Sequence, residues 1–105
     1  MNALSLAASV QPVPASEPAR ELAIVIHLLA DASPGLLSRV LEPLAKRDLV
    51  PDKVLARRDG DAMRIELRLD AVEEDAAHRV LGNLAQIIGM RSVRHELVVT
   101  RRMAA

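Results

Sequence analysis

The sequence contains no phenylalanine, tyrosine, tryptophan or cysteine. Without aromatic faces it lacks the platforms on which proteins stack the bases of single-stranded nucleic acids. Without cysteine, the sequence excludes disulfides, thiolate metal sites and cysteine nucleophiles, and it fits a reducing compartment. The 14 basic residues are balanced by 14 acidic ones, so the chain also lacks the positive charge expected of a nucleic-acid-binding protein.

Long apolar runs are missing as well. The main one, Leu22 to Ala30, is under half of the roughly 20 residues that a membrane-spanning helix needs, and His27 interrupts it. Residues 1–20 have no basic segment and are not typical of a signal peptide. We therefore expect a cytoplasmic protein with no membrane or nucleic-acid partner. Its predicted parts are a flexible leader over 1–20, one domain over 21–100 and a tail over 101–105.

What the chain does have is aliphatic: half of its residues are hydrophobic, and the pattern alternates between strand and helix periods. The pattern predicts strands over 22–30, 53–58, 63–69 and 92–100 and helices over about 33–47 and 70–88. The order βαββαβ predicts an α+β, ferredoxin-like sandwich in which a four-stranded antiparallel sheet carries both helices on one face. The first and third strands are expected in the centre of the sheet and the second and fourth at its edges.

Several residues predict where these elements start and stop. Ser33 is expected to cap the first helix, and Pro43 to kink it or end it early. Asp70 and Glu73 resemble a capping box for the second helix, and Gly89 is expected to end that helix. Asp59-Gly60-Asp61 predicts a hairpin turn. The side chains expected to face inward from the second helix are Ala76, Ala77, Val80, Leu81, Leu84, Ile87 and Ile88.

The uncovered face of this sheet is expected to carry both charged and apolar groups. Its predicted members are Arg64, Glu66, Arg68, Arg94 and Glu96, with His27, Val25 and Leu29 beside them. Two interpretations stay open for this face: a docking surface for another subunit, or a solvated surface with weak cross-strand ion pairs. The three histidines have no metal-ligand spacing, so no metal site is predicted.

The stretch DASPGLLSRV at 31–40, followed by LEPLAKRDLVPDKV, resembles the ACT domain family over residues 21–100. Within that family it is most similar to the regulatory small subunits of acetolactate synthase, through the Leu-Ser-Arg-Val run after Gly35 and through Ile65-Glu66-Leu67. The resemblance implies a βαββαβ module that pairs with a second copy, binds an amino acid and regulates an enzyme of amino-acid metabolism, here branched-chain amino-acid biosynthesis.

The turn between the first strand and the first helix is the predicted ligand site, because free N–H groups at a helix N-terminus favour a carboxylate. The candidate residues are Asp31, Ala32, Ser33, Pro34, Gly35, Leu36, Leu37 and Val50. The alternative is that the turn only caps the helix. By resemblance, Ala32 and Val50 occupy positions where the family often has polar anchors, and Asp48 replaces a frequent glycine.

No catalytic triad, phosphate-binding loop or dinucleotide motif is present in the sequence, so we expect no enzyme activity and no cofactor. The first hypothesis is a homodimeric regulatory module that binds an amino-acid effector, a catalytic subunit, or both. The second is an effector-independent structural or activating subunit.

Overall fold

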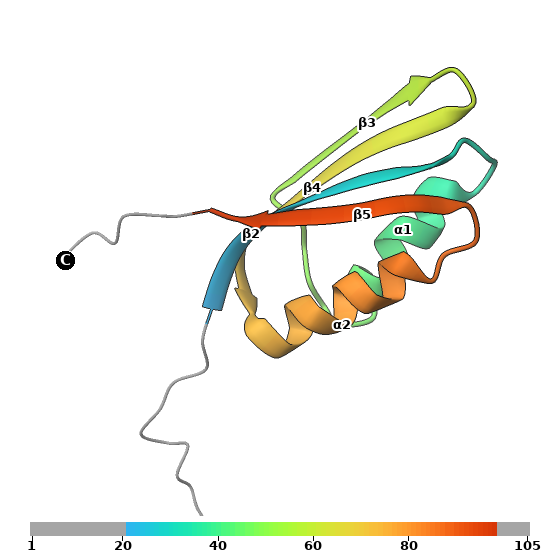
Figure 1. The fold of residues 1–105 in the computed structure, drawn as a ribbon. Helices are drawn as coiled ribbons and strands as arrows, with labels where there is room; N and C mark the ends of the chain where they lie inside the picture. The colour runs from blue at the N-terminus through green and yellow to red at the C-terminus, as the bar shows by residue number, and fades with distance from the viewer. Residues whose placement is uncertain (1–20, 99–105) are drawn as a thin grey trace, which may run out of the picture.

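The computed structural model describes residues 21–98, which form four strands and two helices (Figure 1). In chain order they are β2 (Glu21–Asp31), α1 (Leu36–Ala45), β3 (Lys53–Asp59), β4 (Ala62–Glu73), α2 (Glu74–Ala85) and β5 (Met90–Leu97). The sheet has the order β3-β4-β2-β5 with every neighbouring pair antiparallel, and both helices lie on one face. The predicted βαββαβ fold is confirmed, including the central positions of the first and third strands.

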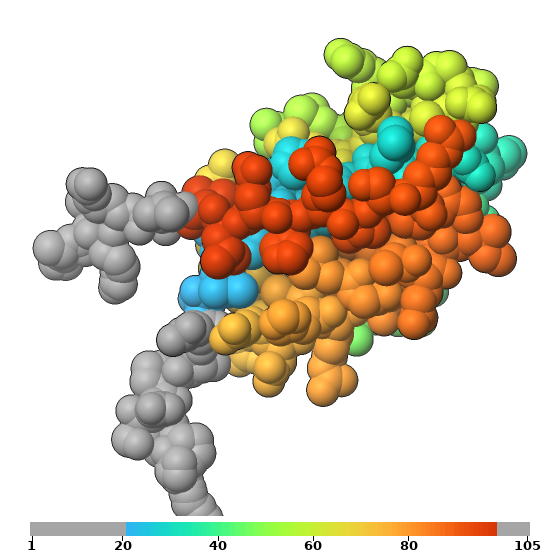
Figure 2. Space-filling view, in the orientation of Figure 1, coloured from blue at the N-terminus to red at the C-terminus, as the bar shows by residue number. Residues whose placement is uncertain are grey.

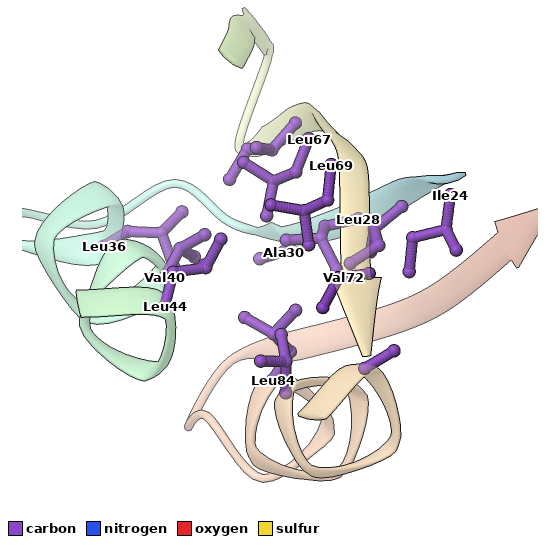
Figure 3. Close-up of a cluster of buried hydrophobic side chains, with 14 residues drawn as sticks. Ile24, Leu28, Ala30, Leu36, Val40, Leu44, Leu67, Leu69, Val72 and Leu84 are labelled. Carbon is purple, nitrogen blue, oxygen red and sulfur yellow. The ribbon is translucent and has the colours of Figure 1, made fainter. Parts of the chain in front are cut away.

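The core lies between the helices and the covered face of the sheet (Figure 3). Alternate residues of β2 and β4 point toward the helices, and α1 adds Leu36, Val40 and Leu44 at four-residue spacing. Among residues 21–98 no polar or charged side chain is buried. Aliphatic side chains therefore make this core without any aromatic one, as the composition requires.

The start of α1 differs from the prediction. Gly35, with a φ of 79°, is the N-cap residue, and no side chain caps the helix. The Ser33 carbonyl instead accepts a hydrogen bond from the Leu36 N–H at 3.2 Å, which closes a turn before the helix begins. Ser33 is thus two positions too early to cap. The helix ends at Ala45, two residues after Pro43, in agreement with the expected early end.

The predicted capping box of α2 is wrong because β4 continues as far as Glu73. The Asp70 carboxylate accepts a hydrogen bond from Arg68 Nε at 2.6 Å, and no side chain caps α2. The helix begins at Glu74 and ends at Ala85, so Gly89 is not its stop. Gly89, with a φ of 92°, lies in the turn into β5. Ile88 is 88% exposed and does not face inward.

The remaining boundaries agree more closely. Gly60 and Asp61 form the turn between β3 and β4, with Gly60 at a φ of 65°. β5 begins two residues earlier than expected, at Met90. The predicted leader 1–20, the end of the last strand at 99–100 and the tail 101–105 lie outside the described residues. Over residues 21–98, neither helix has the length and apolar character needed to span a membrane.

Candidate functional site

The corner between β2 and α1 is held in place from two sides. The Asp31 N–H donates to the Gly89 carbonyl at 2.8 Å, and the Ala32 N–H donates to the Asp61 carbonyl at 2.9 Å. The first bond ties the corner to the loop before β5, and the second ties it to the β3–β4 hairpin. These bonds fix the chain direction just before the predicted ligand turn.

Arg91 strengthens the same junction. Its Nε donates to Asp31 Oδ1 at 2.6 Å, and its Nη2 lies 3.5 Å from Asp61 Oδ1. The hydrogen bond to Asp31, helped by the two nearby negative charges, raises the pKa of Arg91 above its usual value. The Asp31 carboxylate is therefore engaged within the chain. Arg91 was not among the candidates, because its contact with Asp31 joins residues 60 positions apart.

The turn itself is open. An added Cβ at Gly35 meets no atom within 4 Å, so space is free beside the N-cap. The Leu37 and Ser38 N–H groups, in the first helical turn, have no acceptor within the described part of the chain. Arg39 reaches back, with Nη2 3.1 Å from Ser33 Oγ, and places a positive charge near this end. Free N–H groups, the helix dipole and a guanidinium together favour an anion here.

The other candidates are divided between core and surface. Leu36 is 1% exposed and belongs to the core, whereas Leu37 is 39% exposed. Ala32 is half-buried, and Pro34 and Gly35 are exposed. The structure thus brings the residues from Asp31 to Leu37 together as one turn, as their adjacency in sequence requires.

Val50 is not part of that turn. It is 81% exposed in the connector before β3. Lys53 pairs with Arg68, whereas Asp31 pairs with Ala62, six residues away along β4. Six residues of a strand span about 20 Å. Within one copy of the chain, Val50 therefore lies at the opposite end of the sheet from the turn.

Asp48, in the same connector, has a φ of 56°, which places it in the left-handed region. Its N–H donates to the Ala45 carbonyl at 3.1 Å, and the next N–H, from Leu49, donates to the Leu44 carbonyl at 2.9 Å. Glycine adopts this conformation with less strain than any other residue. The position that the family often fills with glycine is thus one that requires a positive φ.

The sheet face without helices, called here the open face, has the composition predicted for it. His27 pairs with Glu66 on β4 and with Arg94 on β5. Strand β3 adds Leu55 and Arg57, which were not predicted on this face. Their alternation with Lys53 was the available signal. A groove of about 510 Å³ lies on the open face, with β2 and β4 in its middle.

The part of the chain that the structure describes contains no candidate metal-binding site. Within residues 21–98 no three histidine or acidic side chains gather closely enough to hold an ion. Two places among the described residues can bind a ligand: the turn before α1, which favours an anion, and the groove of the open face.

A sequence model of the ACT-like domain family matches residues 17–102. The fold is shared by an ACT domain of a GTP pyrophosphokinase from Chlorobium tepidum, with a TM-score of 0.64 and 12% identity over 73% of this chain and 100% of that one. It is also shared by a homoserine dehydrogenase from Thiobacillus denitrificans, with a TM-score of 0.65 and 18% identity over 75% of this chain. The match covers only 18% of that dehydrogenase.

The regulatory subunit of aspartate kinase from Thermus thermophilus, in its ligand-free form, matches with a TM-score of 0.54 and 19% identity over 75% of this chain and 53% of that one. No curated protein matches the sequence. The family match covers most of the chain, and its element order and sheet topology are those described above. The chain therefore belongs to the ACT-like domain family.

Proposed function

We propose that this chain is a non-catalytic regulatory module that pairs with a second copy through β3 and responds to a small amino-acid effector. The observation that carries the proposal is the exposure of the edge strand β3. All seven of its residues are exposed, and it forms one edge of the sheet. Exposed strand edges are sites of association unless something covers them.

Exposed apolar side chains are frequent in the part of the sequence that leads into β3. Four of the large exposed hydrophobic residues belong to α1, the connector after it, or β3. They are Leu37, Val50, Val54 and Leu55. A two-fold axis beside β3 covers the same strand edge on both copies, and with it part of Val54 and Leu55, which is the arrangement of most homodimers.

An antiparallel pair of β3 strands also explains the separation of Val50 from the turn. The two-fold axis places the start of the partner's β3 beside the end of this one, at Asp59. That end of the sheet carries the corner at Asp31 and Ala32, because Asp59 and Asp31 both pair with Ala62. The partner's connector, with its Val50, thus approaches the turn that one copy leaves open.

The effector chemistry follows from the turn. The carboxylate of an amino acid fits the free Leu37 and Ser38 N–H groups, with Arg39 nearby and open space beside Gly35. The apolar Leu37 and Val50 favour an aliphatic side chain over a charged one. The proposed site comprises residues 31–37 of one copy and Val50 of the other.

A second candidate is an effector-independent subunit that only supports a catalytic partner. It is favoured by the lack of side-chain anchors at the turn. Ala32 offers a methyl group, and the Asp31 carboxylate is already bound by Arg91. An amino group of an effector would then find no free carboxylate among the turn residues 31–37.

The enzyme that is regulated is proposed from the sequence resemblance alone. The run Leu37-Ser38-Arg39-Val40 supports the catalytic subunit of acetolactate synthase as the partner. Copurification with that subunit, followed by its activity with and without added chain, tests this step separately from pairing.

Light scattering tests the pairing. We expect a dimer for the natural chain and a monomer for Leu55→Lys, because a lysine on β3 places like charges at the two-fold interface. Ile88→Lys is the matched control, since Ile88 is equally apolar and more exposed but lies before β5. A monomer in the natural chain at high concentration contradicts the proposal.

A thermal-shift screen over the amino acids tests the effector. Binding raises the unfolding temperature by mass action, and we expect the aliphatic amino acids to give the largest rise. A flat response in a chain that is dimeric selects the effector-independent subunit instead.

A further inference from the structure

The groove on the open face is built from rows of residues that cross all four strands. One row runs Arg57, Arg64, Leu29, Ser92, and the next runs Leu55, Glu66, His27, Arg94. In Figure 2, side chains of β2 (cyan) are visible between β5 (orange-red) and the β3–β4 hairpin (yellow-green). The groove thus has guanidinium groups toward its two margins and Leu29 and Leu55 in its surface.

The charge of this groove differs from that of the chain. The whole sequence is neutral, whereas the groove is lined by three arginines and one glutamate. Arg64 is paired with Asp59 at 3.3 Å, and Glu66 is paired with Lys53 at 3.4 Å. Over the described residues, Arg57 and Arg94 have no carboxylate within 4.0 Å. Two exposed guanidinium groups are therefore available to an external anion.

The two free arginines lie at opposite margins. Arg57 is on β3 and Arg94 is on β5, the two edge strands, and they are offset by one row of the sheet. With neighbouring strands about 4.8 Å apart, their Cα atoms are roughly 16 Å from each other. Their side chains point over the same face, and the two strands between them contribute Arg64 and Glu66 from β4 and Leu29 and His27 from β2.

We propose that the open-face groove binds an elongated organic dianion, a molecule with an anionic group at each end. Each guanidinium pairs with one end in the forked geometry that arginine offers to carboxylates. The middle of the ligand crosses β4 and β2, where Leu29 offers an apolar contact. A volume of about 510 Å³ is within the range of small-molecule sites. This site is separate from the turn at 33–37 and does not depend on the proposed effector.

Charge decides against a second copy as the occupant. Two open faces brought together would place Arg57, Arg64 and Arg94 of both copies in one interface, and like charges at an interface are unfavourable. Pairing through the edge of β3 leaves the open face free. An acidic peptide also has a suitable charge. Binding of such a peptide in place of a dicarboxylate would contradict the proposal.

Calorimetric titration of the full chain with straight-chain α,ω-dicarboxylates, from succinate to sebacate at constant ionic strength, tests the proposal. We expect affinity to rise with chain length to a maximum and to exceed that of hexanoate and of inorganic phosphate. Arg57→Gln and Arg94→Gln are each expected to weaken binding about tenfold, the loss of one charge-assisted hydrogen-bonded pair. Arg79→Gln is the matched control, because Arg79 is exposed on α2, on the other side of the sheet.

Three results overturn the proposal. One is equal affinity for every chain length, or for phosphate, which indicates a general anion patch. Another is equal weakening in Arg79→Gln. The third is binding of a glutamate-rich peptide with none of any dicarboxylate. Circular dichroism of the variants shows whether they fold, and both arginines are exposed, so their replacement is expected to leave the fold intact.

Discussion

Leu67 and Val54 are cross-strand partners on the same face of the sheet, yet their surroundings differ completely. Leu67, on β4, is 0% exposed, whereas Val54, on β3, is 41% exposed. The helices cover β2, β4 and β5, and β3 extends beyond them (Figure 1). The comparison teaches that an apolar residue of a strand is buried only where a second layer reaches it.

The same comparison separates stability from association. The residues of β4 that face the helices belong to the core cluster, which holds the domain together. The apolar residues of β3 make no such contribution in a single copy. Exposed edges with apolar residues are sites of association unless something covers them, which is the basis of the pairing proposed above.

Replacing each member of the pair by alanine gives the largest expected difference. Leu67→Ala is expected to lower the free energy of unfolding by about 3 kcal/mol, through lost burial and the cavity left behind. Val54→Ala is expected to lower it by about 0.5 kcal/mol, because most of that side chain stays in contact with water in one copy. Urea unfolding at low protein concentration measures both values, and equal losses would show that β3 is covered within a single chain.

The connector between α1 and β3 contains Asp48, whose φ of 56° lies in the left-handed region that favours glycine. Because a positive φ costs alanine more than glycine, Asp48→Gly is expected to be more stable than Asp48→Ala by about 1 kcal/mol. Thermal unfolding of the two variants measures this difference. Equal stabilities would mean that the turn relaxes to a negative φ.

The junction at the other end of β3 depends on Arg91. Arg91→Gln removes the charged contacts with Asp31 and Asp61 and is expected to change global stability little, since all three side chains are exposed. Its effect should be local: faster hydrogen exchange of the Ala32 N–H, which donates to the Asp61 carbonyl. Arg79→Gln serves as the control, and unchanged exchange in both variants would show that the backbone bonds alone hold the junction.

Much of the fold followed from the sequence because its apolar periods are clear. The alternation of Met63, Ile65, Leu67 and Leu69 predicted a strand with one covered face, and the burial of the last three confirms it. The helix caps could not be predicted in the same way. Ser33 has the side chain of an N-cap residue, but the Ser33–Leu36 turn shifts the helix start to Gly35 and beyond.

The sequence predicted only the part of the candidate site whose residues are adjacent in the chain. Residues 31–37 form one turn because they are adjacent, whereas the separation of Val50 from them follows from strand register, which the sequence does not state. The groove on the open face depends on the same register. Arg57 and Arg94 lie 37 positions apart in the sequence, and only the order β3-β4-β2-β5 places them on opposite margins of one surface.

The central claim is that two copies meet at β3, and the absence of cysteine makes it directly measurable. A single cysteine introduced as Ala56→Cys, in the middle of β3, carries a spin label, and Ile88→Cys provides the comparison. The electron paramagnetic resonance spectrum is expected to show strong dipolar broadening for the label on β3, because pairing brings two labels within about 10 Å, and little broadening for the label at 88. No broadening from residue 56, or stronger broadening from residue 88, would contradict pairing through β3.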